Sequence, residues 1–464
     1  MENPTISSRR ESYVVKTIAP LGVQGSPNVV SSPLRNSIID NEQKKKKWHV
    51  NGMGSVIYKD HDGFTLMKQI QMGIRTTVSQ VQEKKDKEVT ISDINNVLKL
   101  DFPKKGSLYT PFHQYPPFKF YDYAPLAFRQ LRDRFGIKLQ HYLISLCHEQ
   151  SLSILGTPGK SGSLFFFSAD MQYIIKTITK AESKFLRKIL SNYYNHVMTN
   201  PSTLITRFYG LYSIKPQDGR NVRFIVMNNV FDTNVYVEER YDLKGSTVGR
   251  TLSEKEKSKQ ETFIFKDNDF LDKKRKIHVA KQVRDKLMDQ LKRDCSWLES
   301  VKIMDYSLLL GVHKVTDEDM ANMTVSDTNS LVDDSASGPL PPEDNHAKVA
   351  STSSTIGNST LLSNLFRNTE ATSMEASPLS KHFHGSKLNE FQKFFGGLPS
   401  VEVDGRREIY FVGIIDLLQQ WDSRKQLENL WKGSIHWGDK KNISAVSPKL
   451  YASRFLQFVE KSFD

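Results

Sequence analysis

The chain has 464 residues, of which 38% are apolar and 10% aromatic, so we expect two or three domains or one bilobal enzyme with disordered additions. Its 65 lysine and arginine residues exceed 52 acidic ones, and this +13 charge indicates an anionic partner: nucleic acid, a phospholipid surface or a phosphorylated substrate. Two cysteines exclude a disulfide framework, and without a signal peptide or an apolar run of about 20 residues we expect only peripheral membrane contact.

The first part of the chain, residues 1–48, is rich in Ser, Pro, Asn and charge, and we expect a disordered basic tail. Four lysines and Trp48 end this tail, a pattern typical of a solvated segment, a nuclear-import patch or a lipid-contacting segment. Residues 64–81 then carry apolar side chains at every fourth position, which predicts an amphipathic helix. A second helix is predicted over residues 125–135.

The segment from Ser163 to Ile178 predicts two strands joined by a turn, with Lys176 on the second strand and a helix after it. The preceding Gly/Ser run ends like a Walker A loop. However, Ile154 stands where that motif needs its first glycine, and a strand follows instead of a helix. Either an ordinary hairpin or a kinase-like flap over nucleotide phosphates fits better. If the segment is a flap, Lys176 would contact those phosphates, with Glu182 as an ion-pair partner.

Further along, residues 241–250 place Lys244 and Arg250 on either side of a Gly/Ser/Thr turn. This arrangement is typical of a phosphate clamp assisted by backbone amides, or of a capped surface turn. A long helix is predicted over residues 281–299. It contains Asp294 in a Lys-Arg-Asp tripeptide that resembles a protein-kinase catalytic loop, but the asparagine that this motif requires is missing. An ordinary protein kinase is therefore disfavoured.

Two acidic residues, Asp305 and Asp416, each stand alone in an apolar strip. Burying an isolated carboxylate is costly unless another group compensates its charge. Together with the Gly/Ser hairpin and the strand lysine, they indicate that a cation and a phosphate provide this compensation. This pattern favours phosphoryl transfer from a nucleotide.

The composition changes to Ser, Thr, Asn, Asp and Pro over residues 315–385, where we expect a disordered insertion. Near the C-terminus, Ser447 and Pro448 have the pattern of an N-cap followed by a first-turn proline, which predicts a closing helix.

Several motifs occur in an order that resembles the phosphatidylinositol phosphate kinases, from about residue 64 to Asp464. They are Gly162-Ser163-Leu164-Phe165, the Lys176 strand, Met227-Asn228-Asn229, Asp242-Leu243-Lys244-Gly245-Ser246, Met304-Asp305-Tyr306-Ser307-Leu308-Leu309 and Gly413-Ile414-Ile415-Asp416. The resemblance implies an α+β fold: a bilobal kinase of antiparallel sheets and helices with a flat, basic, membrane-facing surface. The N-terminal lobe would span 49–235, and the C-terminal lobe 236–314 with 386–464.

The resemblance also assigns roles to residues of this chain. Asp305 would be the catalytic aspartate that orients or deprotonates an inositol hydroxyl, and Asp416 the Mg²⁺ ligand. ATP would contact the Gly162–Ser163 flap, Lys176 and a hinge formed by Met227, Asn228 and Asn229. Lys244 and Arg250 would hold the phosphate that is already on the inositol ring, although Val248 and Gly249 depart from the usual type I residues beside them.

The segment after Asp416 is similar to the substrate-selecting loop of type I enzymes, which are phosphatidylinositol-4-phosphate 5-kinases. Glu428 occupies a position at which type II enzymes tend to have alanine, and Lys425 is the first of what are often two consecutive lysines. The implied reaction is ATP-dependent phosphorylation of phosphatidylinositol 4-phosphate at its 5-hydroxyl. A 5-phosphate 4-kinase and a catalytically inactive membrane scaffold are the alternatives. Charge alone would favour a nucleic-acid binder, but this chain lacks the motifs that such proteins carry.

The implied partners are the phosphoinositide and an anionic membrane surface, together with a homodimer and small GTPase regulators as family features. We expect the protein in the cytoplasm on the inner face of the plasma membrane, with the nucleus as a second compartment. Basic clusters at 273–276, 424–425 and 440–441 would attach it, at about 1 kcal/mol per cation near an anionic leaflet.

Overall fold

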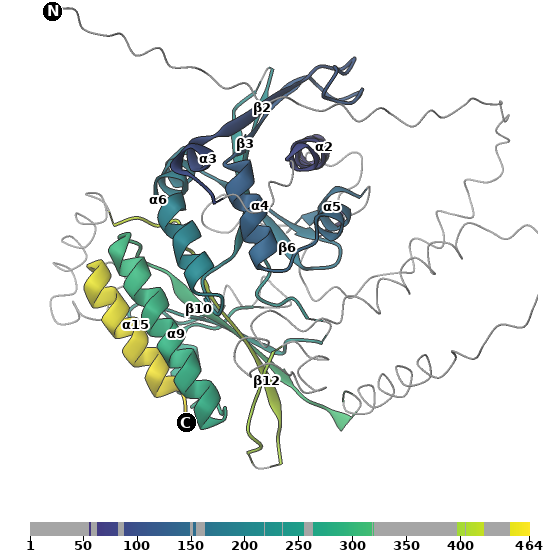
Figure 1. Cartoon of the computed structure of the whole chain (residues 1–464). Helices are drawn as coiled ribbons and strands as arrows, with labels where there is room; N and C mark the ends of the chain where they lie inside the picture. The colour runs from purple at the N-terminus through teal and green to yellow at the C-terminus, as the bar shows by residue number, and fades with distance from the viewer. Residues whose placement is uncertain are drawn as a thin grey trace, which may run out of the picture. The chain divides into compact units, whose positions relative to one another are not determined.

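The computed structural model describes residues 55–56, 63–81, 88–148, 152–154, 163–217, 219–233, 235–254, 263–317, 319, 397–403, 405–421 and 446–464. They belong to one compact unit, Val50–Asp464 (Figure 1). The predicted tail lies outside the described residues, as does the predicted insertion apart from residues 315–317 and 319. In the part of the chain that is described, no helix combines the length and apolar character needed to cross a bilayer.

The first sheet is eight-stranded, in the order β1-β4-β5-β6-β8-β7-β3-β2, and each neighbouring pair is antiparallel. The aromatic and β-branched residues of β5 and β6 favour extended backbone, and Met171, at a φ of 59°, lies in the turn between them. The predicted pair of strands is therefore confirmed. The strands are β1 (Ser55–Val56), β2 (Val97–Phe102), β3 (Phe118–Tyr123), β4 (Leu152–Ile154), β5 (Phe165–Ser168), β6 (Tyr173–Ile178), β7 (Phe208–Pro216) and β8 (Val222–Asn228).

Helices pack against this sheet, and α2 approaches β3 closely. A Cβ atom at Gly73 of α2 would lie 2.0 Å from the Phe120 ring of β3, so only glycine permits this contact. Ile70 and Ile74 of α2 are fully buried, which confirms the predicted amphipathic helix. The helices are α2 (Phe64–Gln80), α3 (Ile91–Asn95), α4 (Pro125–Arg134), α5 (Leu139–Cys147) and α6 (Lys180–Thr199).

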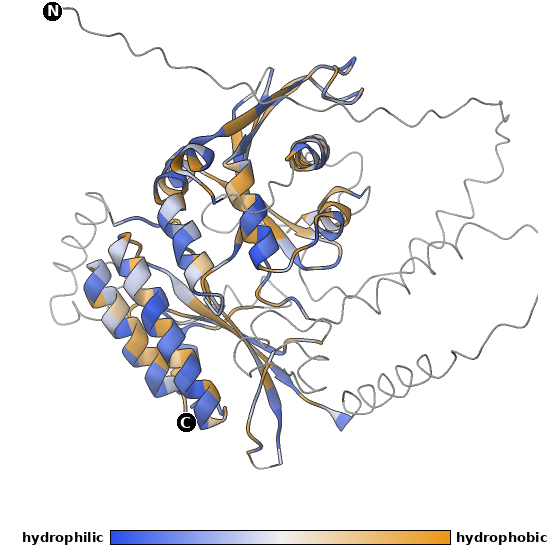
Figure 2. Cartoon of the chain, viewed as in Figure 1, coloured by the Kyte–Doolittle hydropathy of each residue, from blue (hydrophilic) through white to orange (hydrophobic). Residues whose placement is uncertain are grey.

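The second sheet is four-stranded and antiparallel, in the order β11-β12-β10-β9. Two amphipathic helices, α9 and α15, run side by side next to it (Figures 1 and 2). Tyr451 and Phe455 of α15 pack edge-on against Tyr306, and Ser447 caps α15 as predicted. These elements are β9 (Glu239–Leu243), α8 (Asp267–Asp272), α9 (Lys281–Ser300), β10 (Ser307–Lys314), β11 (Leu398–Pro399), β12 (Glu408–Ile415) and α15 (Pro448–Ser462).

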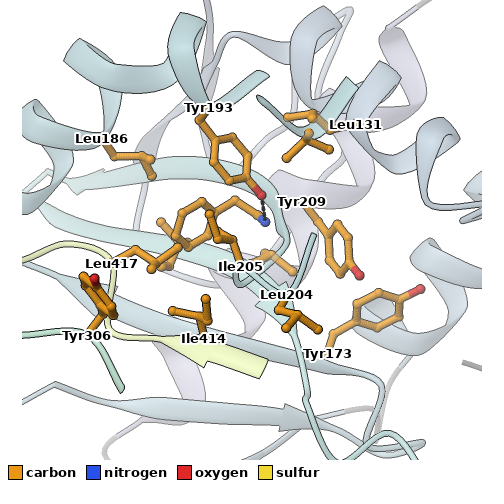
Figure 3. Packing of buried hydrophobic residues seen from close by; sticks show 14 of the residues in the cluster. Leu131, Tyr173, Leu186, Tyr193, Leu204, Ile205, Tyr209, Tyr306, Ile414 and Leu417 are labelled. Carbon is orange, nitrogen blue, oxygen red and sulfur yellow. Dashed lines mark hydrogen bonds between the residues drawn. The ribbon is translucent and has the colours of Figure 1, made fainter. Parts of the chain in front are cut away.

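One buried hydrophobic cluster extends across both sheets, and the chain entering β7 joins them. Ile414 of β12 donates its amide to Leu204 O at 2.7 Å, and Thr206 donates its amide to Ile414 O at 2.9 Å. Figure 3 shows Leu204, Ile205 and Ile414 among the buried side chains at this junction. The two sheets are thus held by backbone hydrogen bonds as well as by apolar packing.

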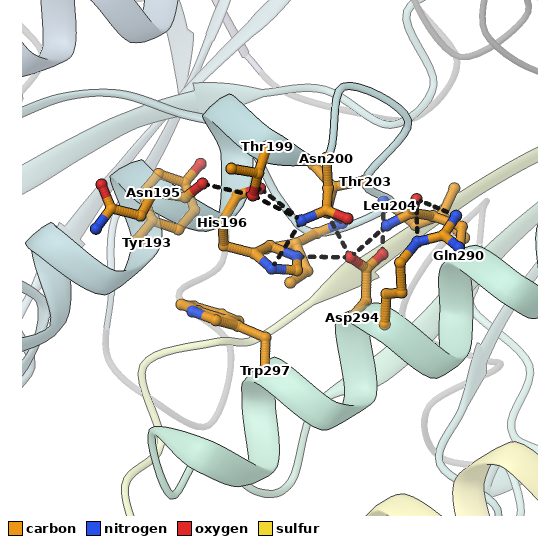
Figure 4. Close-up of polar contacts among 12 residues, drawn as sticks. Tyr193, Asn195, His196, Thr199, Asn200, Thr203, Leu204, Gln290, Asp294 and Trp297 are labelled. Atoms are coloured by element: carbon orange, nitrogen blue, oxygen red, sulfur yellow. Dashed lines mark hydrogen bonds and ion pairs between the residues drawn. The ribbon is translucent and has the colours of Figure 1, made fainter.

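A buried carboxylate reinforces the same junction. Asp294 of α9 is fully buried and accepts four hydrogen bonds of 2.8 Å, from His196, Thr203, Leu204 and Gln290 (Figure 4). Four donors satisfy a charge that would otherwise be costly to bury. The aspartate of the Lys-Arg-Asp tripeptide therefore lies inside a helix, as predicted, and its carboxylate stabilises the fold.

Candidate active site

The end of β9, the start of β10 and the end of β12 lie side by side, and we call this place one edge of the second sheet. β10 pairs with β12 so that Ser307 faces Ile415, and with β9 so that Leu308 faces Leu243. Because these neighbours are antiparallel, the start of β10 lies between the ends of β9 and β12. Lys244, Asp305 and Asp416, which are far apart in the sequence, therefore lie together.

Both aspartates have a left-handed backbone, with φ at 65° for Asp305 and 65° for Asp416. This conformation is uncommon for residues other than glycine, although aspartate tolerates it better than most. The surrounding chain fixes it, because Met304 donates its amide to Gln419 O at 3.2 Å and Trp421 donates to Lys302 O at 2.9 Å. Such backbone strain is concentrated at functional sites in proteins, and here it occurs at the two predicted carboxylates.

Lys244 holds the first of these carboxylates. Its Nζ lies 2.8 Å from Asp305 Oδ1, and the exposed fractions of the two side chains are 13% and 27%. A charge-assisted hydrogen bond in this partly buried setting fixes the direction of the carboxylate. The structure thus brings together two predicted site residues as a pair that the sequence did not indicate.

Lys176 reaches the second carboxylate from the other sheet. Its Nζ lies 3.4 Å from Asp416 Oδ1 and 5.4 Å from the centre of the Phe165 ring on β5. Glu182, which we considered as its partner, instead forms a capping box with Thr179 at the start of α6, so that prediction was wrong. The Thr-x-x-Glu pattern was the signal that would have identified this cap.

Partly exposed apolar side chains stand on the strands that carry or precede the lysine and the aspartate, and on their neighbours, and the sequence reasoning did not single them out. On the first sheet, Ile174 and Met227 face each other across β6 and β8 on the same side as Lys176. On the second sheet, Leu309 and Ile415 share a face and are partly exposed in strands that are otherwise largely buried. Strand alternation relative to Lys176 is the signal that could have identified Ile174.

In the segment Met227–Asn229, which we predicted to contact the nucleotide, the two asparagine side chains bind other parts of the protein. Asn228 Oδ1 accepts the amide of Arg207 at 2.8 Å, and Asn229 Nδ2 donates to Met171 O at 2.7 Å. These amide side chains fix the end of β8 against neighbouring turns. The assignment of this segment as a hinge beside the nucleotide stays a prediction. Because both asparagine side chains are bound within the protein, such contacts would come from the backbone and from Met227.

The turn after β9 is already bound to an internal carboxylate. The consecutive amides of Lys244, Gly245 and Ser246 donate to Asp267 Oδ1 at 2.9, 2.7 and 3.2 Å, and Gly245 has a φ of 66°. Asp267 is fully buried. Of the two alternatives for this turn, the structure favours a turn capped from within the protein over amides that assist phosphate binding, because a protein carboxylate occupies the amides.

Arg250 also has internal partners. Its Nε lies 2.7 Å from Asp267 Oδ2 and its guanidinium lies 2.9 Å from Asp242 Oδ1, with 12% of the side chain exposed. The two carboxylates raise its pKa against the opposing effect of burial. This geometry holds Arg250 against the Lys244 turn, and its contact with the phosphate on the inositol ring stays a prediction.

The remaining predicted site residues are Gly162, Ser163, Lys425 and Glu428. Gly162, Lys425 and Glu428 lie outside the described residues, and Ser163 is buried just before β5. In the basic cluster 273–276, Arg275 forms ion pairs of 3.0 Å with Glu239 and Glu408. That arginine stabilises the second sheet, and its cluster has one fewer cation for lipid contact than expected.

The donor set suits Mg²⁺ only together with a phosphate ligand. Among the residues described, no group of three or more His, Cys, Asp or Glu side chains converges on a metal position. Asp416 provides a single carboxylate with 48% of its side chain exposed. Mg²⁺ is commonly held by one or two carboxylates plus substrate phosphates, so Asp416 fits that arrangement.

The sequence matches the family model described as phosphatidylinositol-4-phosphate 5-kinase over residues 146–462. It is 40% identical over 439 residues to a probable phosphatidylinositol phosphate kinase of Dictyostelium discoideum, covering 88% of this chain and 59% of that protein. It is 39% identical over 403 residues to phosphatidylinositol 4-phosphate 5-kinase type-1 beta of Gallus gallus, covering 87% and 69%. The chain thus spans about two thirds of the length of these relatives.

Proposed function

The chain belongs to the family of phosphatidylinositol-4-phosphate 5-kinases, and we propose that it transfers the γ-phosphoryl group of ATP to the 5-hydroxyl of phosphatidylinositol 4-phosphate. The product would be phosphatidylinositol 4,5-bisphosphate. One observation supports this most strongly: two lysine–carboxylate pairs, Lys244–Asp305 and Lys176–Asp416, lie at the same edge of the second sheet. One pair suits the lipid hydroxyl and the other suits nucleotide phosphates.

On the lipid side, Asp305 accepts the proton of the inositol hydroxyl and orients its oxygen toward the γ-phosphorus. Lys244 holds that carboxylate in place, and its ammonium group is available to the ring phosphate once the lipid is bound. Arg250 and Asp267 act through the Lys244 turn and position it. Their contribution is geometric, and geometry is a large part of phosphoryl-transfer catalysis.

On the nucleotide side, Lys176 compensates phosphate charge, and Ile174, Met227, Leu309 and Ile415 offer apolar contact to the base. Mg²⁺ would be held by Asp416 and, when bound, supplies further charge compensation for the phosphates. As the nucleotide arrives, Lys176 exchanges part of its contact with Asp416 for phosphate oxygens. This exchange is favourable because phosphates carry the greater charge.

The other parts of the proposal concern organisation. Lobes at 49–235 and at 236–314 with 386–464 would place the Lys176–Asp416 pair between them. A basic membrane-facing surface, a homodimer, GTPase regulators and a position on the inner face of the plasma membrane stay predictions. They are consistent with a substrate whose acyl chains remain in the bilayer, since each exposed methylene costs about 0.8 kcal/mol.

The test is phosphorylation of the three phosphatidylinositol monophosphates in separate reactions with labelled ATP, followed by separation of the bisphosphate isomers. We expect the 4,5-isomer from the 4-phosphate. Asp305→Asn and Asp416→Asn should each lower kcat by about a thousandfold, while Asp285→Asn, on the exposed face of α9, should not. A 3,4-product or a 4,5-product made only from the 5-phosphate would contradict the assignment, as would full turnover by either active-site variant.

A further inference from the structure

The loop between β2 and β3, residues 103–117, carries two of the most exposed large apolar side chains in the described part of the chain. Leu108 is 79% exposed and Phe112 is 77% exposed, and Tyr109 between them is 50% exposed. β2 is the last strand of the first sheet, four strands from the Lys176 strand in the sheet order (Figure 1). The loop therefore lies apart from the candidate active site.

The exposure is built into an ordered loop. Gly106 turns the chain at a φ of 72°, Ser107 donates its amide to Thr110 O at 2.9 Å, and Thr110 Oγ1 donates to Asp101 O at 3.1 Å. Gln80 of α2 binds the carbonyl of Tyr109 at 3.3 Å. A Cβ at position 106 would lie 2.9 Å from the amide nitrogen of Phe112, so the turn requires glycine. The backbone is held while the apolar side chains remain in water.

Cations stand beside this apolar tip. Lys104 and Lys105 are both exposed, and neither forms an ion pair with a carboxylate among the described residues. Figure 2 shows hydrophilic and hydrophobic residues interspersed in this hairpin. Protruding aromatic and aliphatic side chains next to unpaired lysines complement an anionic lipid surface, which offers hydrocarbon below a layer of negative charge.

We propose that residues 103–117 are a membrane-docking loop that inserts Leu108, Tyr109 and Phe112 among the head groups of an anionic phospholipid bilayer. Lys104 and Lys105 contact the lipid phosphates. A protein partner fits less well, because three side chains at a loop tip cannot supply the roughly 1,200–2,000 Å² that a stable protein interface buries. The docking loop goes beyond the proposed catalytic reaction and needs neither ATP nor the active-site carboxylates.

Insertion is measured first by a gain of signal. Both native cysteines, Cys147 and Cys295, are buried, so a cysteine introduced by Phe112→Cys can be labelled selectively with an environment-sensitive fluorophore. Vesicles of phosphatidylcholine and phosphatidylserine should shift its emission to the blue. Ile91→Cys, on α3, is the matched control because Ile91 is 74% exposed and lies outside the loop. No shift at position 112, or an equal shift at position 91, would overturn the proposal.

Binding is measured next by vesicle sedimentation without ATP. Leu108→Ser with Phe112→Ser should weaken binding by at least about tenfold, because the loss of as few as two buried methylene groups suffices for that change. Lys104→Gln with Lys105→Gln should weaken it by at least about fivefold at low salt. Ile91→Ser should bind like the parent. Unchanged vesicle binding by the apolar double variant overturns the proposal. This holds also if gel filtration shows that the variant is a monomer where the parent is a dimer, because the loop would then be a contact between two copies of the chain.

A short-chain, water-soluble phosphatidylinositol 4-phosphate separates docking from catalysis. Leu108→Ser with Phe112→Ser should turn this substrate over at the parental rate and lose activity only on vesicles. If the parent does not phosphorylate the soluble lipid at all, the proposed reaction fails, while vesicle sedimentation still decides the role of the loop. A parallel loss on both substrates contradicts a docking role.

Discussion

Lys244 contributes two groups to the site, and they bind two different carboxylates. Its backbone amide donates to Asp267 at 2.9 Å, whereas its Nζ contacts Asp305 at 2.8 Å. A substitution of the side chain leaves the amide, and with it the turn after β9, in place. The proposed catalytic contribution of this residue can therefore be separated from its structural one.

We predict that Lys244→Met lowers kcat on phosphatidylinositol 4-phosphate by about a hundredfold, because Asp305 loses the cation that orients it. The KM for ATP should change little, since the proposed nucleotide side is formed by Lys176 and Asp416, which pair with each other. Steady-state kinetics with each substrate varied in turn measures both. Lys314→Met is the matched control, because Lys314 pairs with Glu239 at the opposite end of β10. If the KM for ATP rises while kcat stays unchanged, Lys244 contributes to ATP binding and not to the orientation of Asp305, which contradicts the prediction.

At the scale of elements, α8 and the turn after β9 form one unit around Asp267. This carboxylate accepts three backbone amides and pairs with Arg250, and it is fully buried. The turn of Lys244 therefore depends on a residue 23 positions later in the sequence. No periodic pattern or motif in the sequence marks such a partner.

Asp267→Asn should lower the free energy of unfolding by about 3–5 kcal/mol, the usual cost of breaking a buried ion pair. The new amide would direct an N–H group toward the Arg250 Nε–H or toward the three backbone amides, so that hydrogen-bond donors would face each other without an acceptor. Urea denaturation followed by circular dichroism provides the measurement. Asp272→Asn, at the exposed end of the same helix, should leave the midpoint unchanged. Equal midpoints for both variants would show that the Lys244 turn does not need this charge.

Sequence patterns predicted the elements whose burial is one-sided. The apolar spacing of α2 and α9 and the aromatic and β-branched run of β6 each indicated the element that forms. By contrast, β7 is buried almost throughout and shows no alternation, and α3 has only five residues, so neither gave a periodic signal. In the candidate site, residue type singled out Asp305 and Asp416, whose roles stay predictions, whereas their pairing with lysines depended on strand register, which the sequence did not reveal.

At the scale of the molecule, the two sheets share one core, and buried polar groups connect their elements. Asp294 joins α6, α9 and the chain before β7. A second buried carboxylate, Asp122 of β3, is 2% exposed inside the first sheet. Burial raises its pKa to about 7 from an ordinary value of 3.8, and Arg132 and Thr77 offset only part of this effect. Asp122 therefore links the stability of the fold to pH.

The sign of this linkage follows from proton binding. Between about pH 4 and pH 7, folded Asp122 retains a proton that the unfolded chain has released, so the free energy of unfolding falls as pH rises. The contribution of this group is about 1.4 kcal/mol per pH unit in that range and becomes constant above about pH 7. Asp122→Asn removes it, so the variant should gain stability relative to the parent as pH increases from about 5 to about 7.

Urea denaturation of parent and variant over that pH range measures the difference directly, because all other titrating groups contribute to both chains. Asp101→Asn on neighbouring β2 is the matched control, since Asp101 is exposed and, within the described part of the chain, its carboxylate pairs with Lys119 alone, at 3.2 Å. Its stability should run parallel to that of the parent across the range. If the difference between Asp122→Asn and the parent stays constant with pH, folded Asp122 is ionised throughout, and Arg132 compensates its burial in full.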